Sequence, residues 1–524
     1  MRQVFWKSAL TLLLFHIVSF FIFPWSILLL LVTVPLFLLG LHDMKQKSHA
    51  ILRNFPVLGH FRYMLEKIRP EINQYFIESN TDGVPFSREE RSLVYQRAKK
   101  VTDTLPFGTQ RNVYEVGHEY VVHSMIPTHY DPKNLRTMVG GKDCKKPYDA
   151  SIFNISAMSY GSLSKNAILA LNGGSKDAGF AHNTGEGGIS PYHLEHGGDL
   201  IWQIGTGYFG CRDEEGRFSE TLFAEKAAFE SVKMIEIKLS QGAKPGHGGI
   251  LPKEKLTKEI SKIRNVPMGR DVISPPGHSA FSTPRELCLF IKKLRDLSGG
   301  KPVGLKLCIG RESEFIGLCK AMIETNITPD FIAVDGSEGG TGAAPLEFSN
   351  SMGMPGQDAI IFVINTLRGF NLKNEIRVIA TGKLTSAFGL IRNLCLGVDI
   401  CYAGRSFLLA LGCIQALRCN TNDCPTGVAT QDPNLVAGLD VKNKRNRVKN
   451  FHQQTMKGVS EMLGAMGVKN HQSLSPHYLK RRVSQFEVQS MSELVNWVED
   501  GSYIKGIIPP RWQREFELAS TDKF

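Results

Sequence analysis

The sequence has 524 residues, of which 42% are hydrophobic and 21% charged, a balance that argues against a disordered chain and for a large folded core. The formal net charge of +12 would suit an anionic partner, but charge alone does not identify one. The densest basic run, residues 442–449, has no interleaved aromatic residues. It is either a solvated face or a lipid-contacting patch, and no nucleic-acid partner is predicted.

The amino-terminal segment is strongly apolar. Residues 8–41 contain no Lys, Arg, Asp or Glu, and one straight helix of that length would run roughly 50 Å, against about 30 Å for a bilayer core. Pro24 divides the run into halves, and basic residues flank it on both sides: Arg2, Lys7, Lys45 and Lys47. This pattern predicts a transmembrane hairpin over residues 1–47, at the cell membrane, with the rest of the chain in the cytoplasm. A single tilted span, with the first half in the interface, is the alternative.

The remaining chain alternates helical and β-rich stretches. Residues 48–110 are predicted to be a helical linker region and residues 451–524 a helical tail, because spaced apolar positions occur among charges. Between them, eight strands are predicted, with helices between several of them: Ile155–Ser159, Phe180–Asn183, Ile235–Ser240, Asp271–Ser274, Val303–Cys308, Phe331–Asp335, Arg377–Thr381 and Asp399–Ala403. This count predicts an α/β fold, a (β/α)8 TIM barrel over residues 111–450, with a doubly wound sheet as the alternative. The long gap after the second strand is expected to hold an insertion.

Glycine-rich loops follow most of the predicted strands. They read SAMSYGSLS, NTGEGG, QGAKPGHGG, SPPGHS, DGSEGGTGAAP, TGKLTS and AGRSF. Glycine lets a backbone approach a ligand closely and presents bare N–H groups to phosphate, so this rim predicts a phosphorylated cofactor or substrate. Lys306 ends an apolar strand. It either pairs with a carboxylate of the barrel or lies beside the pyrimidine edge of a flavin, where it would stabilise the negative charge formed on reduction.

Three of the ten cysteines are grouped just after the last predicted strand. Cys413, Cys419 and Cys424 are separated by five and then four residues. The group is too sparse for a structural zinc site and differs from four-cysteine iron–sulfur runs. It suits a cluster lacking one iron, or a four-iron cluster with one other ligand, and three unrelated buried thiols are the alternative.

These motifs, in this order, resemble the FMN-binding domain of glutamate synthase over roughly residues 110–470. The resemblance implies FMN in a (β/α)8 barrel and a [3Fe–4S] cluster held by Cys413, Cys419 and Cys424. It further implies reductive amination of 2-oxoglutarate, through 2-iminoglutarate, to glutamate. Lys244 and Arg264 are implied to bind the 2-oxo acid, and Lys244, Lys306 and Glu186 to act in catalysis, with Glu186 on the ammonia side. The FMN-binding residues implied are Ala157, Met158, Ser159, Gln241, Lys306, Gly339, Gly340, Gly382, Lys383, Gly404 and Arg405.

The sequence also departs from this family. Family members commonly have an acid and a glutamine where this chain has His247 and Ile250, which weakens the case for 2-oxoglutarate. The full-length enzymes begin with a glutaminase domain, whereas Met1 here opens an apolar hairpin, so we expect ammonia that this chain does not make. The expected partners are a 2-oxo acid, ammonia, the membrane and an electron-donor protein of unknown identity. The alternatives are an FMN/iron–sulfur oxidoreductase acting on another oxo acid or imine, and a membrane-bound electron-transfer or scaffold subunit.

Overall fold

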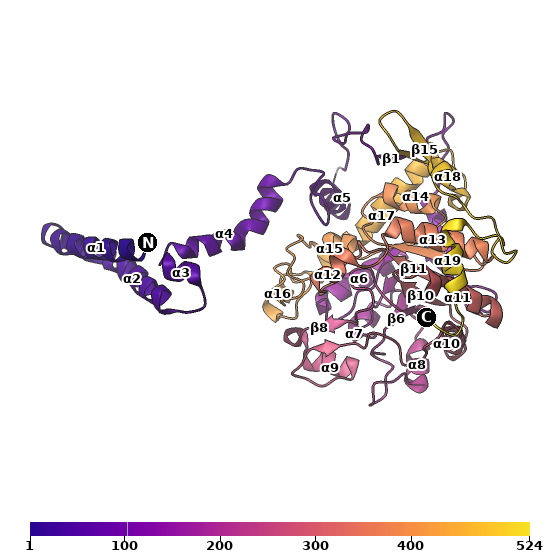
Figure 1. Cartoon of the computed structure of the whole chain (residues 1–524), viewed down its shortest axis with the longest axis horizontal. Coiled ribbons are helices and arrows are strands. Elements are labelled where there is room, and N and C mark those ends of the chain that lie inside the picture. Colours follow the sequence, from indigo (N-terminus) through magenta and orange to yellow (C-terminus); the bar gives the residue numbers. More distant parts are fainter. Residues whose placement is uncertain (102) are drawn as a thin grey trace. The chain divides into compact units, whose positions relative to one another are not determined.

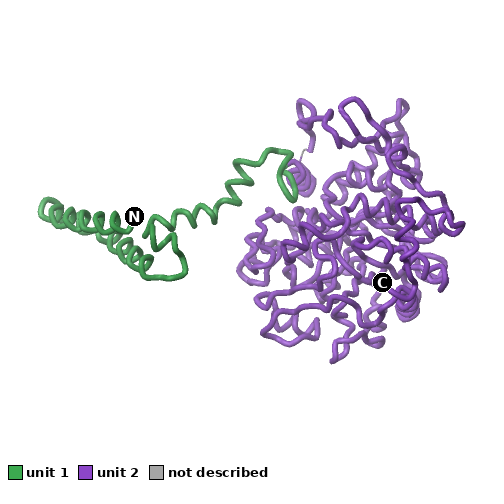
Figure 2. The backbone as a smooth tube through the Cα atoms, viewed as in Figure 1, with its two compact units in different colours: residues 1–88 green, residues 89–524 purple. Residues whose placement is uncertain are grey.

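The computed structural model describes every residue except 102 and divides the chain into two compact units, Met1–Arg88 and Glu89–Phe524 (Figure 2). The boundary lies inside the predicted linker region.

The first unit begins with two apolar helices. Helix α1 (Arg2–Ile22) is followed by a 3-10 turn that starts at Pro24 and by α2 (Leu30–Lys45), which folds back along α1 (Figure 1). The rings of Phe5 and Phe37 stack with centroids 5.8 Å apart, and His16 Nε2 lies 3.0 Å from the Thr33 hydroxyl. Both halves, Arg2–Ile22 and Pro24–Lys45, are long and apolar enough to cross a membrane by length and composition.

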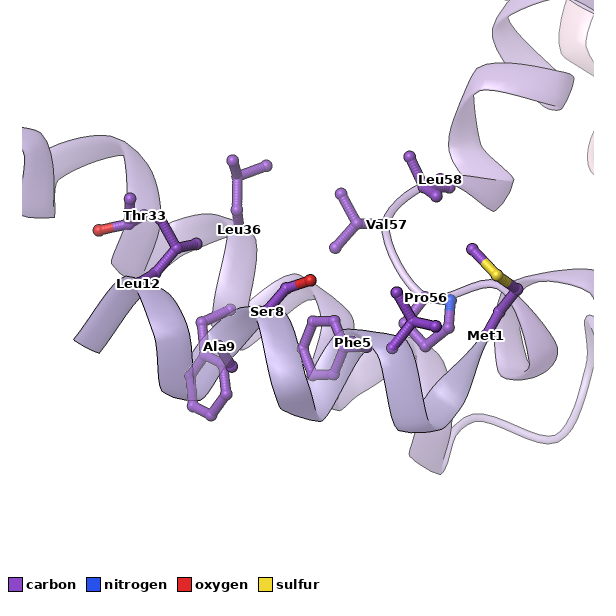
Figure 3. A pocket seen from close by; sticks show the side chains of 12 residues that line it. Met1, Phe5, Ser8, Ala9, Leu12, Thr33, Leu36, Pro56, Val57 and Leu58 are labelled. Carbon is purple, nitrogen blue, oxygen red and sulfur yellow. The ribbon is translucent and has the colours of Figure 1, made fainter. Parts of the chain in front are cut away.

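A turn closes the base of this hairpin. Asp43, near the end of α2, is buried and accepts hydrogen bonds from the Val57 backbone N–H (2.9 Å) and from His60 Nε2 (2.9 Å). Phe5, Leu36, Pro56 and Val57 line an apolar pocket of about 270 Å³ between the two helices and this turn (Figure 3). The short helix α3 (Ala50–Asn54), α4 (Gly59–Ile72) and a π-helical turn (Asn73–Ile77) complete the unit.

The second unit contains a closed barrel of eight parallel strands. In chain order these are β4 (Phe153–Ile155), β5 (His182–Asn183), β6 (Leu200–Ile204), β7 (Val232–Lys238), β10 (Val303–Leu307), β11 (Phe331–Asp335), β12 (Arg377–Thr381) and β13 (Ile400–Ala403). The barrel closes where β13 pairs with β4 and β7 with β10. The predicted (β/α)8 fold is therefore confirmed, and the doubly wound sheet is excluded.

Helices surround the barrel in the second unit (Figure 1). They are α6 (Lys165–Ala178), α7 (Pro191–Leu194), α8 (Glu220–Ala227), α10 (Pro284–Leu297), α11 (Glu312–Thr325), α13 (Gly356–Gly369), α14 (Ala387–Cys395) and α15 (Arg405–Leu411). The long helix α17 (Val441–Ala465) packs on α6, and its His452 stacks on Phe180 with ring centroids 3.9 Å apart. Burial of such apolar surface between helices and strands is the main stabilising contribution to the unit. Further helices are α5 (Arg88–Lys99), α9 (Lys258–Arg264), α12 (Leu346–Ser351), α16 (Pro433–Ala437), α18 (Met491–Leu494) and α19 (Pro510–Leu518).

One strand prediction was wrong, and a second was misplaced, because the predicted strand Ile155–Ser159 overlaps β4 only at Ile155. Asp271–Ser274 supplies no barrel strand: β9 (Val272–Ile273) pairs antiparallel with β8 (Ile250–Leu251) outside the barrel. The missing barrel strand is β6, which lies in the stretch expected to be an insertion. All five β6 residues are buried, so the strand has no alternating pattern, and the insertion instead separates β7 from β10.

The predicted helical tail also contains strands. Strands β14 (Leu479–Arg482) and β15 (Val488–Ser490) form a small antiparallel sheet with β1 (Glu119–Val121). The boundary predicted at residue 450 falls inside α17. A second small sheet pairs β2 (Arg136–Val139) with β3 (Tyr148–Ser151).

Candidate active site

Asp335, the last residue of β11, contacts groups at the ends of several other strands at the rim of the barrel. Its carboxylate accepts a hydrogen bond from the Gly242 N–H at 3.0 Å and from the Thr381 hydroxyl, and it lies 3.6 Å from Lys306 Nζ. Burial raises the pKa of Asp335, but Lys306 and these hydrogen bonds outweigh it and lower the pKa below its ordinary value. Lys306 is thus buried and paired with a barrel carboxylate, which was one of the two arrangements expected from the sequence.

Several predicted FMN-binding residues meet at the ends of β4, β11 and β13. Arg405 donates to the Glu338 carbonyl at 2.6 Å, and a Cβ added to Gly340 would lie 2.6 Å from Arg405 Nε. A Cβ on Gly404 would lie 2.6 Å from Met158 Cε. At both positions the nearest atoms belong to a flexible side chain, so the contacts show that these loops pack closely together. Ala157 and Ser159 flank Met158 and are partly exposed, Gly339 and Gly382 are partly exposed, and Lys383 is exposed.

Gln241 has an unused donor. Its side chain follows β7, and its Nε2 is buried without a hydrogen-bond partner among the described residues. A buried amide that lacks a partner costs stability unless a ligand or water completes it. Together with the close glycine contacts, this orphaned donor fits the polar edge of a bound flavin.

Four charged side chains gather where the loops after β5 and β7 meet the insertion. Glu186 Oε1 lies 2.9 Å from Lys238 Nζ, at the end of β7. Lys244 Nζ donates to the Ala343 carbonyl at 2.9 Å. Arg264, the last residue of α9, donates to the Tyr160 carbonyl at 3.1 Å, and its Nε has no partner among the described residues.

The electrostatics of this cluster favour an anion. Burial lowers the pKa of Lys244 to about 8 and that of Arg264 to about 10, although Glu186 opposes both shifts. Burial raises the pKa of Glu186, yet Lys238, Lys244 and Arg264 together lower it below its ordinary value. Three cations therefore share one carboxylate, and a second anion would balance the site.

Sequence reasoning grouped Glu186, Lys244 and Arg264 by resemblance, and the structure brings all three together. It missed Lys238, which is 8% exposed. The signal was present, because Lys238 ends the largely apolar stretch MIEIK, and Lys306 is the penultimate residue of VGLKL. His247 lies on the neighbouring loop, with Nδ1 2.9 Å from the Gly248 carbonyl oxygen, and Ile250 is half-buried in β8.

The three grouped cysteines lie close enough to affect one another electrostatically. Burial raises the pKa of Cys413 to about 12, and the two other thiols add to that rise. Burial likewise raises the pKa of Cys424, but hydrogen bonds from Thr426 and nearby backbone N–H groups bring it below the ordinary value. Among the described residues no three His, Cys, Asp or Glu side chains are placed to hold a metal ion, so the cluster stays a prediction.

A closed barrel with buried charges at the carboxyl ends of its strands is the architecture of a TIM-barrel enzyme. A family model described as a conserved region in glutamate synthase matches residues 100–469. The chain therefore belongs to the glutamate synthase family and is an oxidoreductase of that family.

Individual relatives agree with this assignment. A glutamate synthase large subunit-like protein of Bacillus subtilis is 35% identical over 510 residues, which cover 89% of this chain and 97% of that protein. The archaeal glutamate synthase (NADPH) of Methanocaldococcus jannaschii is 36% identical over 321 residues, or 61% of this chain and 60% of that protein. Among solved structures, a flavocytochrome b2 mutant with pyruvate bound is 12% identical with a TM-score of 0.42, covering 86% of this chain and 92% of that one. That likeness carries no weight for function.

Proposed function

We propose that this chain reductively aminates 2-oxoglutarate, through 2-iminoglutarate, to glutamate, with FMN and a [3Fe–4S] cluster as cofactors. The observation that carries the proposal is the cluster of buried cations around Glu186, beside the glycine-rich rim. Relatives named as glutamate synthases support the reaction class. FMN, when bound and reduced by the electron donor, would supply the hydride that reduces the imine.

Lys244 and Arg264 are suited to bind the carboxylates of a 2-oxo dicarboxylate. Both are buried, and Arg264 Nε has no partner among the described residues. Each charge-assisted hydrogen bond contributes about 1.5–3 kcal/mol. Arg264 is held in place by the ring of Phe209, whose centroid lies 5.2 Å from its Cζ, so little side-chain entropy is lost on binding.

Glu186 is suited to the nitrogen donor. Its pKa is lowered by its cationic neighbours, so it is ionised at neutral pH and accepts hydrogen bonds from ammonium. A carboxylate with a lowered pKa is a weak base, so its role would be to position the nitrogen donor beside the oxo acid rather than to deprotonate ammonium. A Cβ on Gly249 would lie 2.5 Å from Glu186 Oε1, so the loop after β7 covers this carboxylate closely.

The rim residues are suited to hold FMN. Gln241 and Lys306 would face the polar edge of the isoalloxazine ring, beside Ala157, Met158 and Ser159. Gly339, Gly340, Gly382, Lys383, Gly404 and Arg405 would surround the ribityl phosphate, where bare N–H groups and cations favour an anion. Cys413, Cys419 and Cys424 would hold the cluster, whose role is to pass electrons to the flavin.

The anchor is part of the proposal. Residues 1–47 would span the membrane twice, because Arg2–Ile22 and Pro24–Lys45 each have sufficient length and apolar composition and basic residues flank both ends. The catalytic domain would then lie in the cytoplasm, where free ammonia, an oxo acid and an electron-donor protein are available to it.

A substrate panel tests the proposal. The flavin of the purified protein is reduced without oxygen, and its reoxidation is followed after ammonium and each of several 2-oxo acids are added. Reoxidation by 2-oxoglutarate with ammonium supports the proposal. Faster reoxidation by another oxo acid would favour the second candidate, which His247 and Ile250 suggest, and no response to any acid would favour an electron-transfer or scaffold subunit.

A further inference from the structure

Lys255 is a buried cation outside the substrate site. It ends a short 3-10 turn (Lys253–Lys255) in the insertion between β7 and β10, and its exposed fraction is only 2%. No carboxylate pairs with it among the described residues, whereas buried lysines normally have an anionic partner. Its burial therefore calls for a source of negative charge.

Lys255 contacts the loop that carries Cys413, Cys419 and Cys424, called the cysteine loop below. Its Nζ donates to the Cys419 carbonyl at 2.7 Å and to the Ser162 carbonyl at 3.0 Å. One ammonium group thus ties the insertion to the loop after β4 and to the loop that carries the cysteines. The neighbouring Asn422 side chain donates to the Glu254 carbonyl at 3.1 Å, so the two segments are joined twice.

The charge of Lys255 acts on the cysteines. Burial lowers the pKa of Lys255 to about 8, and the nearby thiols of Cys419 and Cys424 oppose that shift. An ammonium has three N–H donors, of which two are used by the carbonyls, so one remains available. Three thiolates and their cluster would place negative charge beside this donor.

We propose that Lys255 is a positioning residue for the iron–sulfur cluster, holding the cysteine loop and supplying the positive charge that offsets the thiolates. The inference rests on the proposed cofactor. A fixed cation near an iron–sulfur cluster favours the reduced state and raises the reduction potential, because reduction adds negative charge. Outer-shell partners of this kind also strengthen metal retention.

The test uses the purified full-length protein and two variants. Lys255→Gln keeps N–H donors for the two carbonyls but removes the charge, and Lys255→Arg keeps the charge. The control is Lys253→Gln, an exposed lysine on the same turn. Iron per FMN, the rate of iron loss to a chelator and the cluster midpoint potential from a redox titration followed by electron paramagnetic resonance are measured.

Lys255→Gln should lose iron about 10-fold faster or more. The midpoint potential of its remaining cluster should be more negative than in the wild type. Lys255→Arg should keep a midpoint potential near that of the wild type. Lys253→Gln should match the wild type in both the rate of iron loss and the midpoint potential. If Lys255→Gln yields no flavoprotein, Lys255→Arg provides the test. This variant keeps the positive charge, so a midpoint potential clearly more negative than that of the wild type would overturn the inference.

Two negative results are distinguishable. Iron-containing wild-type protein with an unchanged potential and iron-loss rate in Lys255→Gln would overturn this inference alone. Wild-type protein that contains FMN but no iron would overturn the proposed cluster and the inference with it.

Discussion

At the scale of single residues, charge decides where a substrate can bind. Lys238, Lys244 and Arg264 surround one carboxylate, Glu186, and leave net positive charge in a buried site. An enzyme for a neutral substrate would not maintain this arrangement, because each buried cation is costly to desolvate. This charge balance supports the proposed anionic substrate, and the neutral contacts would decide which anion binds.

Ile250→Gln should strengthen 2-oxoglutarate binding by about 10- to 100-fold, because an amide adds a neutral hydrogen bond to the pocket. The dissociation constant can be measured by titrating the oxidised protein and following the flavin spectrum. The matched control is Ile273→Gln, since Ile273 faces Ile250 across the same two-stranded sheet and is largely exposed. Equal affinities in the wild type, Ile250→Gln and Ile273→Gln would show that Ile250 does not contact the substrate.

Lys244 should make substrate binding depend on pH. Burial lowers its pKa to about 8, so the side chain is charged below that value and neutral above it. Affinity for 2-oxoglutarate should accordingly fall as pH rises through this range. Bound substrate raises the pH at which this affinity falls, because an anion stabilises the charged form of the lysine.

Two variants check this assignment by isothermal titration across pH. Lys244→Arg should keep its affinity to higher pH, since a guanidinium stays charged. Lys244→Met should bind weakly at every pH, by roughly 10-fold or more. If the affinity of Lys244→Met still depends on pH as in the wild type, the group that titrates is not Lys244.

At the scale of elements, the barrel could be predicted where strands and loops have distinct composition. Strands β11 and β12 were predicted with their observed bounds, because short apolar runs are bounded there by glycine and charged residues. Strand β6 was missed because LIWQI is buried on both faces and was taken as part of an insertion. Strand β9 was misplaced because two residues cannot reveal which sheet they join.

The site was less predictable than the fold. Lys244 and Arg264 are twenty residues apart in sequence, and only the insertion containing α9 brings the guanidinium beside Glu186. Motif resemblance identified those residues without explaining their proximity. Pairings such as Lys306 with Asp335, and the position of Lys238, depend on barrel register, which no local pattern specifies.

The cysteine loop leads to a prediction of its own. Cys419→Ser should remove most of the iron and leave much of the FMN, because a hydroxyl is a poor ligand for iron–sulfur clusters whereas the flavin residues lie on other loops. Metal analysis and flavin absorbance measure the two contents. The control is Cys144→Ser, whose thiol is half-buried elsewhere and donates to the Gly300 carbonyl. One zinc and no iron in the wild-type protein would contradict the cluster.

At the scale of the whole molecule, the proposed membrane anchor would determine where the enzyme works. Helices α1 and α2 expose most of their apolar side chains, an arrangement that is unfavourable in water and favourable in lipid. Their flanking basic residues favour a cytoplasmic barrel.

Protease added outside intact cells should therefore leave the barrel uncut, and protease added to inverted vesicles should degrade it. Immunoblotting for the carboxyl terminus measures both. Deletion of residues 1–47 should move the flavoprotein from the membrane to the soluble fraction. Cleavage of the barrel from outside, in cells shown to be intact, would reverse the proposed topology.

In the proposed reaction, this molecule places nitrogen from ammonium onto 2-oxoglutarate. The most direct measurement is a single turnover: protein with reduced flavin is mixed without oxygen with isotopically labelled ammonium and 2-oxoglutarate, and glutamate is analysed by mass spectrometry. We predict labelled glutamate in proportion to the flavin reoxidised, and much less from Lys244→Met. Flavin that stays reduced, or is reoxidised without labelled glutamate, would contradict the assignment.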